Sequence, residues 1–415
     1  GGEGDIAYSW DFGDESEPSE EAAPTHVYQP GTYTVTLTVT RGGVAVSETR
    51  EDIVRAIPHR VVVAEGDSLE AAIASGADEV VLKPGTHEVI DGISLMRPVD
   101  ICSESGNPAD TVIYSSVRLI ANGKLRLMKI ANPDVTLRNL TLRGGCLTTG
   151  SDDQPGATLW MNGGVCENCV LESGYCVYSA AVYVSGGVLR HSIIRNCTSW
   201  SSSGKGAGLL VTGTAETSGL VDGCVISNNV VCNTTWNLTG AGAYVSGTGR
   251  LRNSLVADNF GSECAGIAIV SADAEVENCT VVGNRATTTT DGTKVGGVET
   301  TETPKVLRNM IVWGNTAENG TANFAELNDP SAFSYSCSPA LTAGVNHNLA
   351  GDPLFRRPAK GDWRLCGGSP CVGTGLVEGW MSGATDLRGR ARKIGGAVSM
   401  GAYECMPNGL SVIVR

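Results

Sequence analysis

Paired carboxylates, spaced cysteines and scattered histidines are the side chains of this sequence that could do chemistry. Asp152 and Asp153 are adjacent in the stretch GSDDQPG, and two carboxylates held roughly 5–10 Å apart can act as acid and base on a glycosidic bond. A β-elimination would instead need a basic residue, with a calcium ion or an arginine to stabilise the developing charge. Such an Asp–Asp pair is typical of a solvated turn, and the five histidines are scattered. The sequence therefore assigns no catalytic or metal-binding residue.

Cysteine usage says more about location than about catalysis. Cys166-x-x-Cys169 has a spacing found in redox and metal sites, but it lacks the second pair or nearby histidine that would support one. The 14 cysteines among 415 residues are many for a reduced cytosolic protein. Extracellular or cell-surface residence is expected.

Two expectations concern disulfides. Cys366 and Cys371 flank the sequence GGSP and are expected to form a local loop disulfide. Three other cysteines recur at every second repeat of the pattern described below, namely Cys169, Cys224 and Cys279. Two strand spacings separate them by about 9.6 Å, which exceeds the roughly 7 Å between Cα atoms that a disulfide spans. They should not pair with one another.

The composition is typical of short strands joined by many turns. Glycine accounts for 54 residues, hydrophobic residues for 41% and charged residues for only 18%, so the chain is not disordered by composition. Acidic residues outnumber basic ones by 44 to 30, giving a net charge of −14, which argues against a nucleic-acid partner. No run of about 18 apolar residues occurs, so no membrane insertion is expected.

The chain repeats between about residues 110 and 325, with spacings of 23 to 32 residues. Seven segments align: LRNLTLRGG from 137, CENCVLESG from 166, LRHSIIRNC from 189, VDGCVISNN from 221, LRNSLVADN from 251, VENCTVVGN from 276 and LRNMIVWGN from 307. Short β-branched strands at this period predict a right-handed parallel β-helix. Each coil would add one strand layer of about 4.8 Å.

Asparagine recurs at two offsets of the repeat. The third position of the segments holds Asn139, Asn168, Asn253, Asn278 and Asn309, with His191 and Gly223 in the remaining two. Six residues further on, four successive coils hold Asn229, Asn259, Asn284 and Asn315. We interpret both sets as structural ladders, because a stacked asparagine at a bend can satisfy the amides of the next coil.

Strand alternation predicts an inward and an outward column beside the first ladder. The inward set is Leu140, Cys169, Ser192, Cys224, Ser254, Cys279 and Met310. The outward set is Thr141, Val170, Ile193, Val225, Leu255, Thr280 and Ile311. An exposed column of this kind would be unusual in a monomer, so it is expected to contact another chain. The alternative is that the bend reverses the alternation and the column is core.

Charges alternate in sign along the residues that precede the first ladder. The basic members are Arg138, Arg190, Arg252 and Arg308, and the acidic ones between them are Glu167, Asp222 and Glu277. Adjacent coils would neutralise each other. This pattern favours a solvated row over a binding groove, which would keep one sign of charge.

The first 57 residues carry a different pattern. WDFGD at 10–14 and PTHVY at 24–28 precede PGTYTVTLTV at 30–39, where apolar residues and threonines alternate. This order resembles the PKD domain, an immunoglobulin-like sandwich that usually serves as a spacer or weak binding module on secreted proteins. Trp10 and Tyr33 would anchor its core. The acidic run Asp11, Asp14, Glu15 and Glu17 could hold calcium, although a solvated turn is the simpler interpretation, and no other cofactor is expected.

Residues 58–110 are interpreted as the N-terminal cap and first coils of the β-helix. A short helix with Ser68 as its N-cap precedes a strand, the Pro84–Gly85 turn and a second strand. The order resembles the N-terminal cap of pectin-lyase-like parallel β-helices. Coils are expected over 111–345.

A C-terminal cap is expected over 346–408. It carries DPLF, GDWRL, GSPCV, ATDLRGRAR and GGAVSMGAYE in that order. The set resembles the tail of bacterial secreted β-helix proteins of the choice-of-anchor Q type, except that Gly373 replaces the aspartate that usually follows the GSP turn.

The segment 409–415 is strongly β-forming and is expected to protrude. Because few residues precede Trp10, we expect the PKD-like sheet to have an uncovered edge that such a strand could complete. The contact would join Leu410, Val412, Ile413 and Val414 to the face that carries Trp10 and Tyr33. Copies of the chain, or tandem units of a longer one, would then assemble head to tail into a filament.

The expected fold is all-β: a partial immunoglobulin-like PKD sandwich followed by a right-handed parallel β-helix with a C-terminal cap. The first functional hypothesis is a non-enzymatic structural protein of the bacterial surface, such as a fibre or adhesin-like stalk. The alternative is a secreted β-helix that binds extracellular polysaccharide or degrades it as a lyase or a hydrolase. Asp152-Asp153 resembles the aspartate pair of polygalacturonases, but their NTD, Gly-His-Gly and Arg-Ile-Lys motifs are missing.

Overall fold

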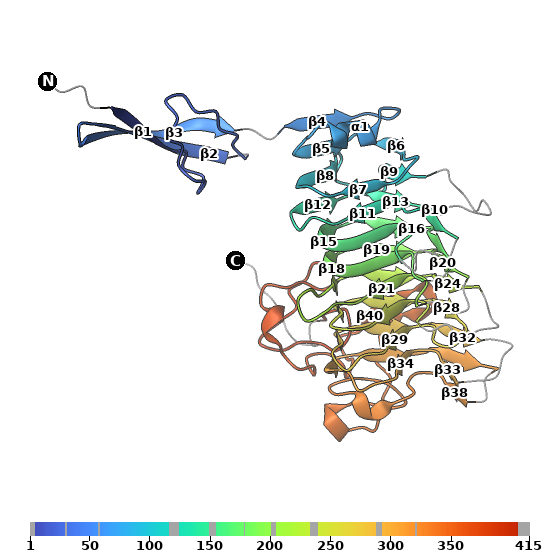
Figure 1. Ribbon diagram of the computed structural model, residues 1–415. Helices are drawn as coiled ribbons and strands as arrows, with labels where there is room; N and C mark the ends of the chain where they lie inside the picture. The colour runs from blue at the N-terminus through green and yellow to red at the C-terminus, as the bar shows by residue number, and fades with distance from the viewer. Residues whose placement is uncertain are drawn as a thin grey trace, which may run out of the picture. The chain divides into compact units, whose positions relative to one another are not determined.

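The computed structural model describes residues 5–29, 31–56, 59–115, 124–148, 155–177, 179–200, 205–232, 240–287, 293–319 and 322–405 (Figure 1). The chain forms two compact units. The first comprises residues 1–61 and 75–79, and the second comprises residues 62–74 and 80–415. No helix in the described ranges is long and apolar enough to cross a membrane.

The first unit is built on a three-stranded antiparallel sheet in the order β1-β2-β3. Its strands are β1 (Ile6–Asp11), β2 (Gly31–Arg41) and β3 (Val44–Ala56). Gly42 and Gly43 form the tight turn between β2 and β3, and both have positive φ angles that favour glycine. The threonine face of β2 is tied to β3 by side-chain hydrogen bonds such as Thr38–Ser47 at 2.8 Å.

Residues from the WDFGD and PTHVY motifs meet in an aromatic cluster. The rings of Phe12 and His26 stack with centroids 3.9 Å apart, and Tyr28 meets both edge-on. Nε2 of His26 lies 2.7 Å from Oδ2 of Asp14. Hydrogen bonds from Ser16 and His26 lower the pKa of Asp14 to about 2. Asp14 is therefore engaged within its own turn, and calcium binding by the acidic run stays a prediction.

Trp10 and Tyr33 take separate places around this cluster. Tyr33 packs against Tyr28 with centroids 4.8 Å apart, and Trp10 lies opposite Leu37 while its Nε1 donates to the Glu21 carbonyl. An apolar pocket of about 650 Å³ opens between Trp10, Leu37 and their neighbours. The proposed strand partners Leu410, Val412, Ile413 and Val414 lie outside the described residues, so that assembly stays a prediction.

The second unit is a right-handed parallel β-helix whose coils stack strand upon strand (Figure 1). Three sheets run along it. Sheet I comprises β4 (Arg60–Val63), β5 (Glu79–Leu82), β7 (Ile93–Leu95), β8 (Val99–Ser103), β11 (Met128–Ile130), β12 (Val135–Arg138), β15 (Leu159–Glu167), β18 (Val182–Arg190), β21 (Leu209–Val211), β22 (Leu220–Asp222), β25 (Ala243–Val245), β26 (Arg250–Arg252), β29 (Ile267–Ile269), β30 (Glu275–Glu277), β34 (Val298–Thr300) and β35 (Val306–Arg308).

The other two sheets are shorter. Sheet II comprises β6 (Gly85–Glu88), β9 (Thr111–Tyr114), β13 (Thr141–Arg143), β16 (Val170–Glu172), β19 (Ile193–Arg195), β23 (Val225–Ser227), β27 (Leu255–Ala257), β31 (Thr280–Val282) and β36 (Ile311–Trp313). Sheet III comprises β10 (Lys124–Leu125), β14 (Cys146–Leu147), β17 (Tyr175–Cys176), β20 (Thr198–Ser199), β24 (Val230–Val231), β28 (Phe260–Gly261), β32 (Arg285–Thr287) and β37 (Thr316–Glu318).

Short elements complete the unit. The helix α1 (Leu69–Ala74) begins as expected at Ser68, whose Oγ accepts the Ala71 amide at 3.1 Å. Two small sheets pair β33 (Thr293–Val295) with β38 (Ala322–Phe324), and β39 (Phe355–Arg357) with β40 (Asp362–Leu365). The 3₁₀ turns are η1 (Pro330–Ala332), η2 (Val345–His347), η3 (Pro358–Lys360) and η4 (Gly379–Met381).

The predicted repeat alignment is confirmed residue by residue. The first residues of the seven segments, from Leu137 to Leu307, are parallel-sheet partners in sheet I from each coil to the next. The alternating charges also meet as expected. They form the ion pairs Arg190–Glu167 (2.8 Å), Arg252–Asp222 (2.8 Å) and Arg308–Glu277 (3.1 Å). Arg138 instead pairs with Asp100 of the preceding coil (2.5 Å), which the alternation did not include.

The first asparagine ladder marks the corner between sheets I and II. Its members have φ angles between 49° and 61°, and His191 and Gly223 share this left-handed conformation. Asparagine tolerates it better than most residues. Some side chains join along the ladder, as where Asn168 Nδ2 donates to Asn139 Oδ1 at 2.7 Å. Backbone conformation therefore explains this ladder better than the satisfaction of buried amides.

The second ladder does satisfy buried amides. Asn229, Asn259 and Asn284 are completely buried. The side-chain oxygens of Asn259, Asn284 and Asn315 each accept two hydrogen bonds from the preceding asparagine, as where Asn259 Oδ1 accepts both the backbone N–H and Nδ2 of Asn229 at 3.0 Å. Asn229 Oδ1, at the start of the series, accepts the Cys197 amide at 3.1 Å. The series ends where Asn315 Nδ2 donates to Glu326 Oε2 at 2.6 Å. Burial raises the pKa of Glu326, and these hydrogen bonds oppose the rise.

The inward column is confirmed, since all its members are at most 1% exposed. Its three cysteines, Cys169, Cys224 and Cys279, are free thiols as expected. Alternate serines bridge the coils. Ser254 Oγ, for example, accepts the Cys224 amide at 3.0 Å and donates to the Arg252 carbonyl at 2.7 Å.

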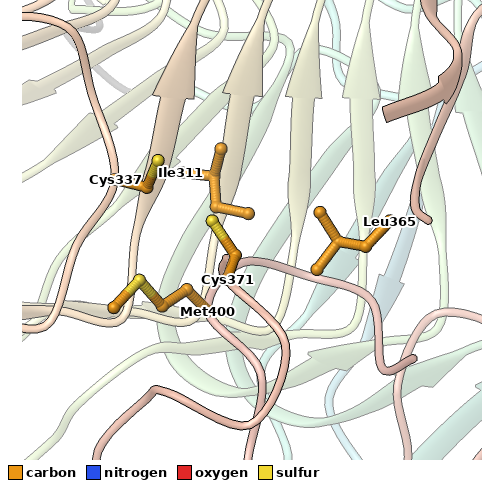
Figure 2. Close-up of a cluster of buried hydrophobic side chains, with 5 residues drawn as sticks. All are labelled: Ile311, Cys337, Leu365, Cys371 and Met400. Atoms are coloured by element: carbon orange, nitrogen blue, oxygen red, sulfur yellow. The ribbon is translucent and has the colours of Figure 1, made fainter. Parts of the chain in front are cut away.

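The expected bond between Cys366 and Cys371 is not formed, and both are free thiols. Cys371 is completely buried beside Cys337, Ile311 and Met400 (Figure 2). A hydrogen bond to Cys371 raises the pKa of the Cys337 thiol, and burial raises it further. Cys366 instead lines a surface groove together with Cys405. The GGSP turn thus directs its two cysteines to different surroundings.

The predicted C-terminal cap has two parts. The end of the coil stack is extended by a partial turn, in which Cys337 bridges to Ile311 on one side and to Leu349 on the other. Residues 352–405 then fold back over the outer face of sheet II. Phe355, Trp363, Leu387 and Tyr403 pack there against a cluster formed by Leu255, Ala257 and Val282.

The first ladder helps to hold this returning segment, hereafter the C-terminal segment (352–405). Asn309 Nδ2 donates to the Leu376 carbonyl at 2.8 Å, and its Oδ1 accepts the Leu376 amide at 2.7 Å. Asn253 Nδ2 donates to the Thr385 carbonyl at 2.6 Å. The ladder asparagines therefore gain a second role at the far end of the stack.

The outward column points outward as predicted, but its expected exposure is wrong, because none of its seven members is exposed. In the first coils Thr141 and Val170 are 3% and 8% exposed. Leu255, Thr280 and Ile311 are at most 6% exposed. Their cover comes from the same chain, since the Ala402 amide donates to Thr280 Oγ1 at 2.9 Å and Met400 packs near Ile311. Ile193 and Val225 are half-buried. The part of the column from Leu255 to Ile311 is therefore an attachment face for the C-terminal segment in place of a lateral contact between chains.

We expect Asn259→Ala to destabilise the β-helix by roughly 2–4 kcal/mol, because two donors of Asn229 lose their buried acceptor. Denaturant unfolding of the full chain measures the effect. The matched control is Asn168→Gly, which removes an exposed asparagine at a positive φ that glycine adopts freely. Equal destabilisation by both variants would contradict the distinction between the ladders.

Gly401→Ala should loosen the C-terminal segment. A Cβ at Gly401 would lie 2.5 Å from Thr280 Oγ1 and 2.8 Å from an Ile311 methyl, whereas one at Gly383 would meet nothing within 4 Å. Both glycines have a φ of 78°, so backbone strain cancels in the comparison. We expect Gly401→Ala to cost about 1–3 kcal/mol more than Gly383→Ala. Limited proteolysis and thermal unfolding would reveal the difference.

Candidate functional site

A column of outward side chains follows the first sheet I strand of each coil. Its members are partners in register from coil to coil: Lys129, Trp160, Tyr183, Leu210, Tyr244, Ala268 and Glu299. The residues on either side of each member are buried in the coil interior. The column is therefore the outer face of sheet I, and its two halves differ in character.

In the half of the column nearer the N-terminal end, side chains stack on one another around Trp160. The rings of Trp160 and Tyr183 lie 6.0 Å apart and are inclined by 22°. Lys129 Nζ and the Arg126 guanidinium lie 4.1 and 4.7 Å from the Trp160 ring centroid. Since neighbours already use the faces of Trp160, this half is interpreted as a stabilising stack.

The other half brings three charged side chains together. Glu299 lies in the column on β34, whereas Glu263 and Lys294 come from the segments that turn from sheet III into sheet I in two successive coils. Tyr244 packs against Cys264, Ala268 and Val295 at this corner. The small side chain of Ala268 separates Tyr244 from Glu299 along the column. We call Glu263, Lys294 and Glu299 the acid–lysine cluster.

Two atoms of this cluster are buried and lack a hydrogen-bond partner. Lys294 is completely buried, and its Nζ meets no acceptor among the residues that the structure describes. The same holds for Glu299 Oε2. An unpaired buried charge is costly, and native structures satisfy nearly all such groups. These two atoms of the cluster therefore depart from the usual satisfaction of buried polar groups among the described residues.

Burial raises the pKa of both carboxyl groups of the cluster. Burial raises the pKa of Glu299 to about 7, with a further rise from the charge of Glu263 and an opposing effect of Lys294. Burial also raises the pKa of Glu263, and Lys294 opposes that rise. Glu299 in turn raises the pKa of Tyr244, after the larger effect of burial. These side chains thus share one electrostatic environment.

Such an arrangement suits acid–base chemistry. A carboxyl group with a pKa near 7 can donate a proton at neutral pH. A second carboxyl group can activate water or attack directly when it is ionised, and the nearby Lys294 ammonium favours that form of Glu263 against burial. In the described ranges no group of three or more His, Cys, Asp or Glu side chains is placed to hold a metal ion.

The residues singled out from the sequence lie elsewhere. Asp152 and Asp153 fall outside the described residues. Cys166 and Cys169 are both buried in the interior, where a hydrogen bond between their thiols and burial raise the pKa of Cys166. Neither cysteine therefore forms an accessible redox or metal site.

Sequence reasoning missed the acid–lysine cluster although a signal was present. Glu263 directly precedes the recurrent strand CAGIAIV, and Lys294 precedes the corresponding VGGVET. Glu299 occupies the position that aromatic residues hold in earlier coils, such as Tyr244. The sequence signal for this site was therefore Glu299, a charged residue at a repeat position that is aromatic in some earlier coils.

Known proteins are similar to two parts of the chain. Residues 2–55 match the family model of the PKD domain, while no curated protein matches the chain. The crystal structure of pectate lyase Pel9A is similar at 12% identity and a TM-score of 0.46, covering 83% of this chain and 96% of that one. The catalytic domain of a GH87 α-1,3-glucanase in complex with tetrasaccharides is also 12% identical, with a TM-score of 0.25 and coverage of 83% and 86%. The choice-of-anchor Q subtype stays a prediction.

The acid–lysine cluster should leave a signature in the pH dependence of stability. The folded-state pKa of Glu299 is about 7, above the ordinary value of 4.5, so the folded chain holds a proton that the unfolded chain releases. This contribution is fully present below about pH 4.5 and is lost as the pH rises through 7. Glu299→Gln should flatten the profile by up to roughly 3 kcal/mol.

Thermal unfolding of both proteins across this pH range measures the effect. Burial also raises the pKa of Glu404 to about 7, but Glu404 is present in both proteins and cancels in the difference. Glu104→Gln, at an exposed position, should parallel the unsubstituted chain. Parallel profiles for Glu299→Gln as well would contradict the shifted pKa.

Proposed function

We propose that this protein is a secreted β-helix that hydrolyses an extracellular polysaccharide at the acid–lysine cluster. The observation that carries the proposal is the pair of buried, unpartnered charged atoms, Lys294 Nζ and Glu299 Oε2, on the outer face of sheet I. A purely structural coil would be more stable with apolar residues there. Strongly perturbed carboxyl groups at a surface corner are typical of catalytic sites.

The two carboxyl groups would divide the work. Glu299, with its pKa of about 7, would protonate the leaving glycosidic oxygen. Glu263, whose ionised form Lys294 favours against the opposing effect of burial, would either take a proton from the water that attacks the anomeric carbon or attack that carbon itself. In the second case water would then hydrolyse the glycosyl–enzyme bond and release Glu263. The Lys294 ammonium would also stabilise negative charge that develops on substrate oxygens.

An extracellular location fits this activity. The PKD domain match supports secretion or surface display, whereas the 14 cysteines are free thiols and give no such support. The PKD unit would then act as a spacer or as a weak binding module beside the catalytic coils.

The second candidate function is the surface fibre or stalk. Continuous features of the rod favour it, namely the buried ladder from Asn229 to Asn315 and the ion-paired row from Arg138 to Arg308. Because the C-terminal segment covers the outward column, such a fibre would grow end to end, as proposed for residues 409–415. Absence of any hydrolysis would favour this function.

Reducing-end release from a panel of neutral and carboxylated polysaccharides distinguishes the candidates. We expect the purified chain to cleave at least one member, and Glu299→Gln and Glu263→Gln each to lower the rate by roughly 10²–10⁴-fold. Lys294→Met should lower it as well. Glu104→Gln, distant in sequence and exposed, serves as the matched control.

Two results would overturn the proposal. One is a cleavage rate for Glu299→Gln equal to that of the unsubstituted chain on every polysaccharide. The other is the formation of unsaturated sugar ends, which would show elimination in place of hydrolysis. Thermal unfolding of each variant establishes that loss of activity does not come from loss of the fold.

A further inference from the structure

The C-terminal segment carries positive charge in an otherwise acidic protein. Its residues 352–405 include eight Lys or Arg and five Asp or Glu, although the chain as a whole has a net charge of −14. Five of these cations line one surface groove of about 980 Å³: Arg356, Arg364, Arg388, Arg390 and Lys393. We call it the basic groove. None of its residues belongs to the acid–lysine cluster.

Most of these cations are not neutralised by the protein. Arg364 is held by Asp362, with Nη2 2.6 Å from Oδ2. Four cations of the groove form no ion pair with a described residue, and all four are exposed: Arg356, Arg388, Arg390 and Lys393. This contrasts with the row on sheet I, where each arginine meets a carboxylate.

A rigid turn presents two of the free arginines. Asp386 is buried, and its Oδ1 accepts the backbone amides of Arg388 and Arg390 at 2.8 and 2.9 Å. Its Oδ2 accepts the Glu404 amide at 2.9 Å, which anchors the turn to the body of the segment. Little conformational entropy of the backbone would therefore be lost when a ligand binds these arginines.

The acidic groups near the groove are engaged elsewhere. Glu404 lies at its base but is buried, and its two carboxylate oxygens accept the Ser399 amide at 3.1 Å. Arg392 Nε lies 3.4 Å from Glu404 Oε1, also in the interior. Leu365 and Ile394 supply apolar floor. The groove thus combines a cationic rim with a surface on which the C–H face of a sugar ring can rest.

We propose that the basic groove binds the carboxylate groups of an acidic polysaccharide. The exposed guanidinium groups would pair with carboxylates on successive sugars, since arginine matches their planar geometry. The proposal rests on the proposed function only for the class of ligand, because binding here requires no cleavage at the acid–lysine cluster.

Charge favours a glycan over the other polyanions. A nucleic acid would experience the repulsion of a protein with a net charge of −14 along its whole length, whereas a short run of uronate residues needs only the local groove. A second copy of the chain could offer its own acidic turns, and the experiment below treats that as a competing outcome.

Binding of polygalacturonate oligomers at low and moderate salt tests the proposal. The test variant combines Arg388→Gln, Arg390→Gln and Lys393→Gln. We expect it to bind at least tenfold more weakly, and we expect binding by the unsubstituted chain to weaken with added salt. The matched control removes three exposed cations outside the groove by Arg41→Gln, Arg55→Gln and Lys83→Gln, and should bind normally.

Each alternative has its own readout. Equal binding of a neutral oligosaccharide or of single-stranded DNA would overturn the proposal, and so would no measurable binding at low salt. Self-association that the groove variant abolishes would assign the groove to a second copy. Glu299→Gln should bind the oligomers like the unsubstituted chain, so failure of the proposed hydrolysis and failure of this proposal are distinguishable.

Discussion

In-register stacking of one coil on the next is the constraint on which the rest of the structure depends. The buried backbone amides of a coil need hydrogen-bond acceptors. Within the strands the neighbouring coil provides them, but at the corners no strand pairing exists. Left-handed residues such as Asn253 turn the chain between sheets I and II. Buried residues such as Asn259 then supply the missing acceptors at the next corner. Both devices repeat because an offset of one residue would send apolar side chains outward.

A stack of this kind leaves an end and an outer face to be covered. The returning C-terminal segment covers part of the outer face of sheet II, where it buries Leu255, Thr280 and Ile311. Its attachment depends on close backbone approach at Gly401 and on side chains such as Asn309 that already serve the corner. The same fold-back displays a cluster of arginines on a protein that is otherwise acidic.

Charge is handled in two ways along the rod. The row from Arg138 to Arg308 is neutralised coil by coil, which is what a structural surface requires. The acid–lysine cluster departs from that pattern, because Lys294 is completely buried without a described partner and Glu299 titrates near neutrality. This departure within a regular repeat is the observation on which the proposed function rests.

The sequence by itself determined the coil stack: the seven aligned segments, the inward column from Leu140 to Met310 and the alternating ion pairs could all be read from a short period. That information is local, because each strand pairs with the corresponding strand of the next repeat. Only the tertiary structure decided what non-repeating parts contact. Cys371 lies beside Cys337 and not Cys366, the last part of the outward column meets the C-terminal segment, and Glu263 meets Lys294 and Glu299 of the next coil. Loops of unequal length and a segment that returns over the coils carry no period, so their neighbours follow from packing in three dimensions and not from spacing along the chain.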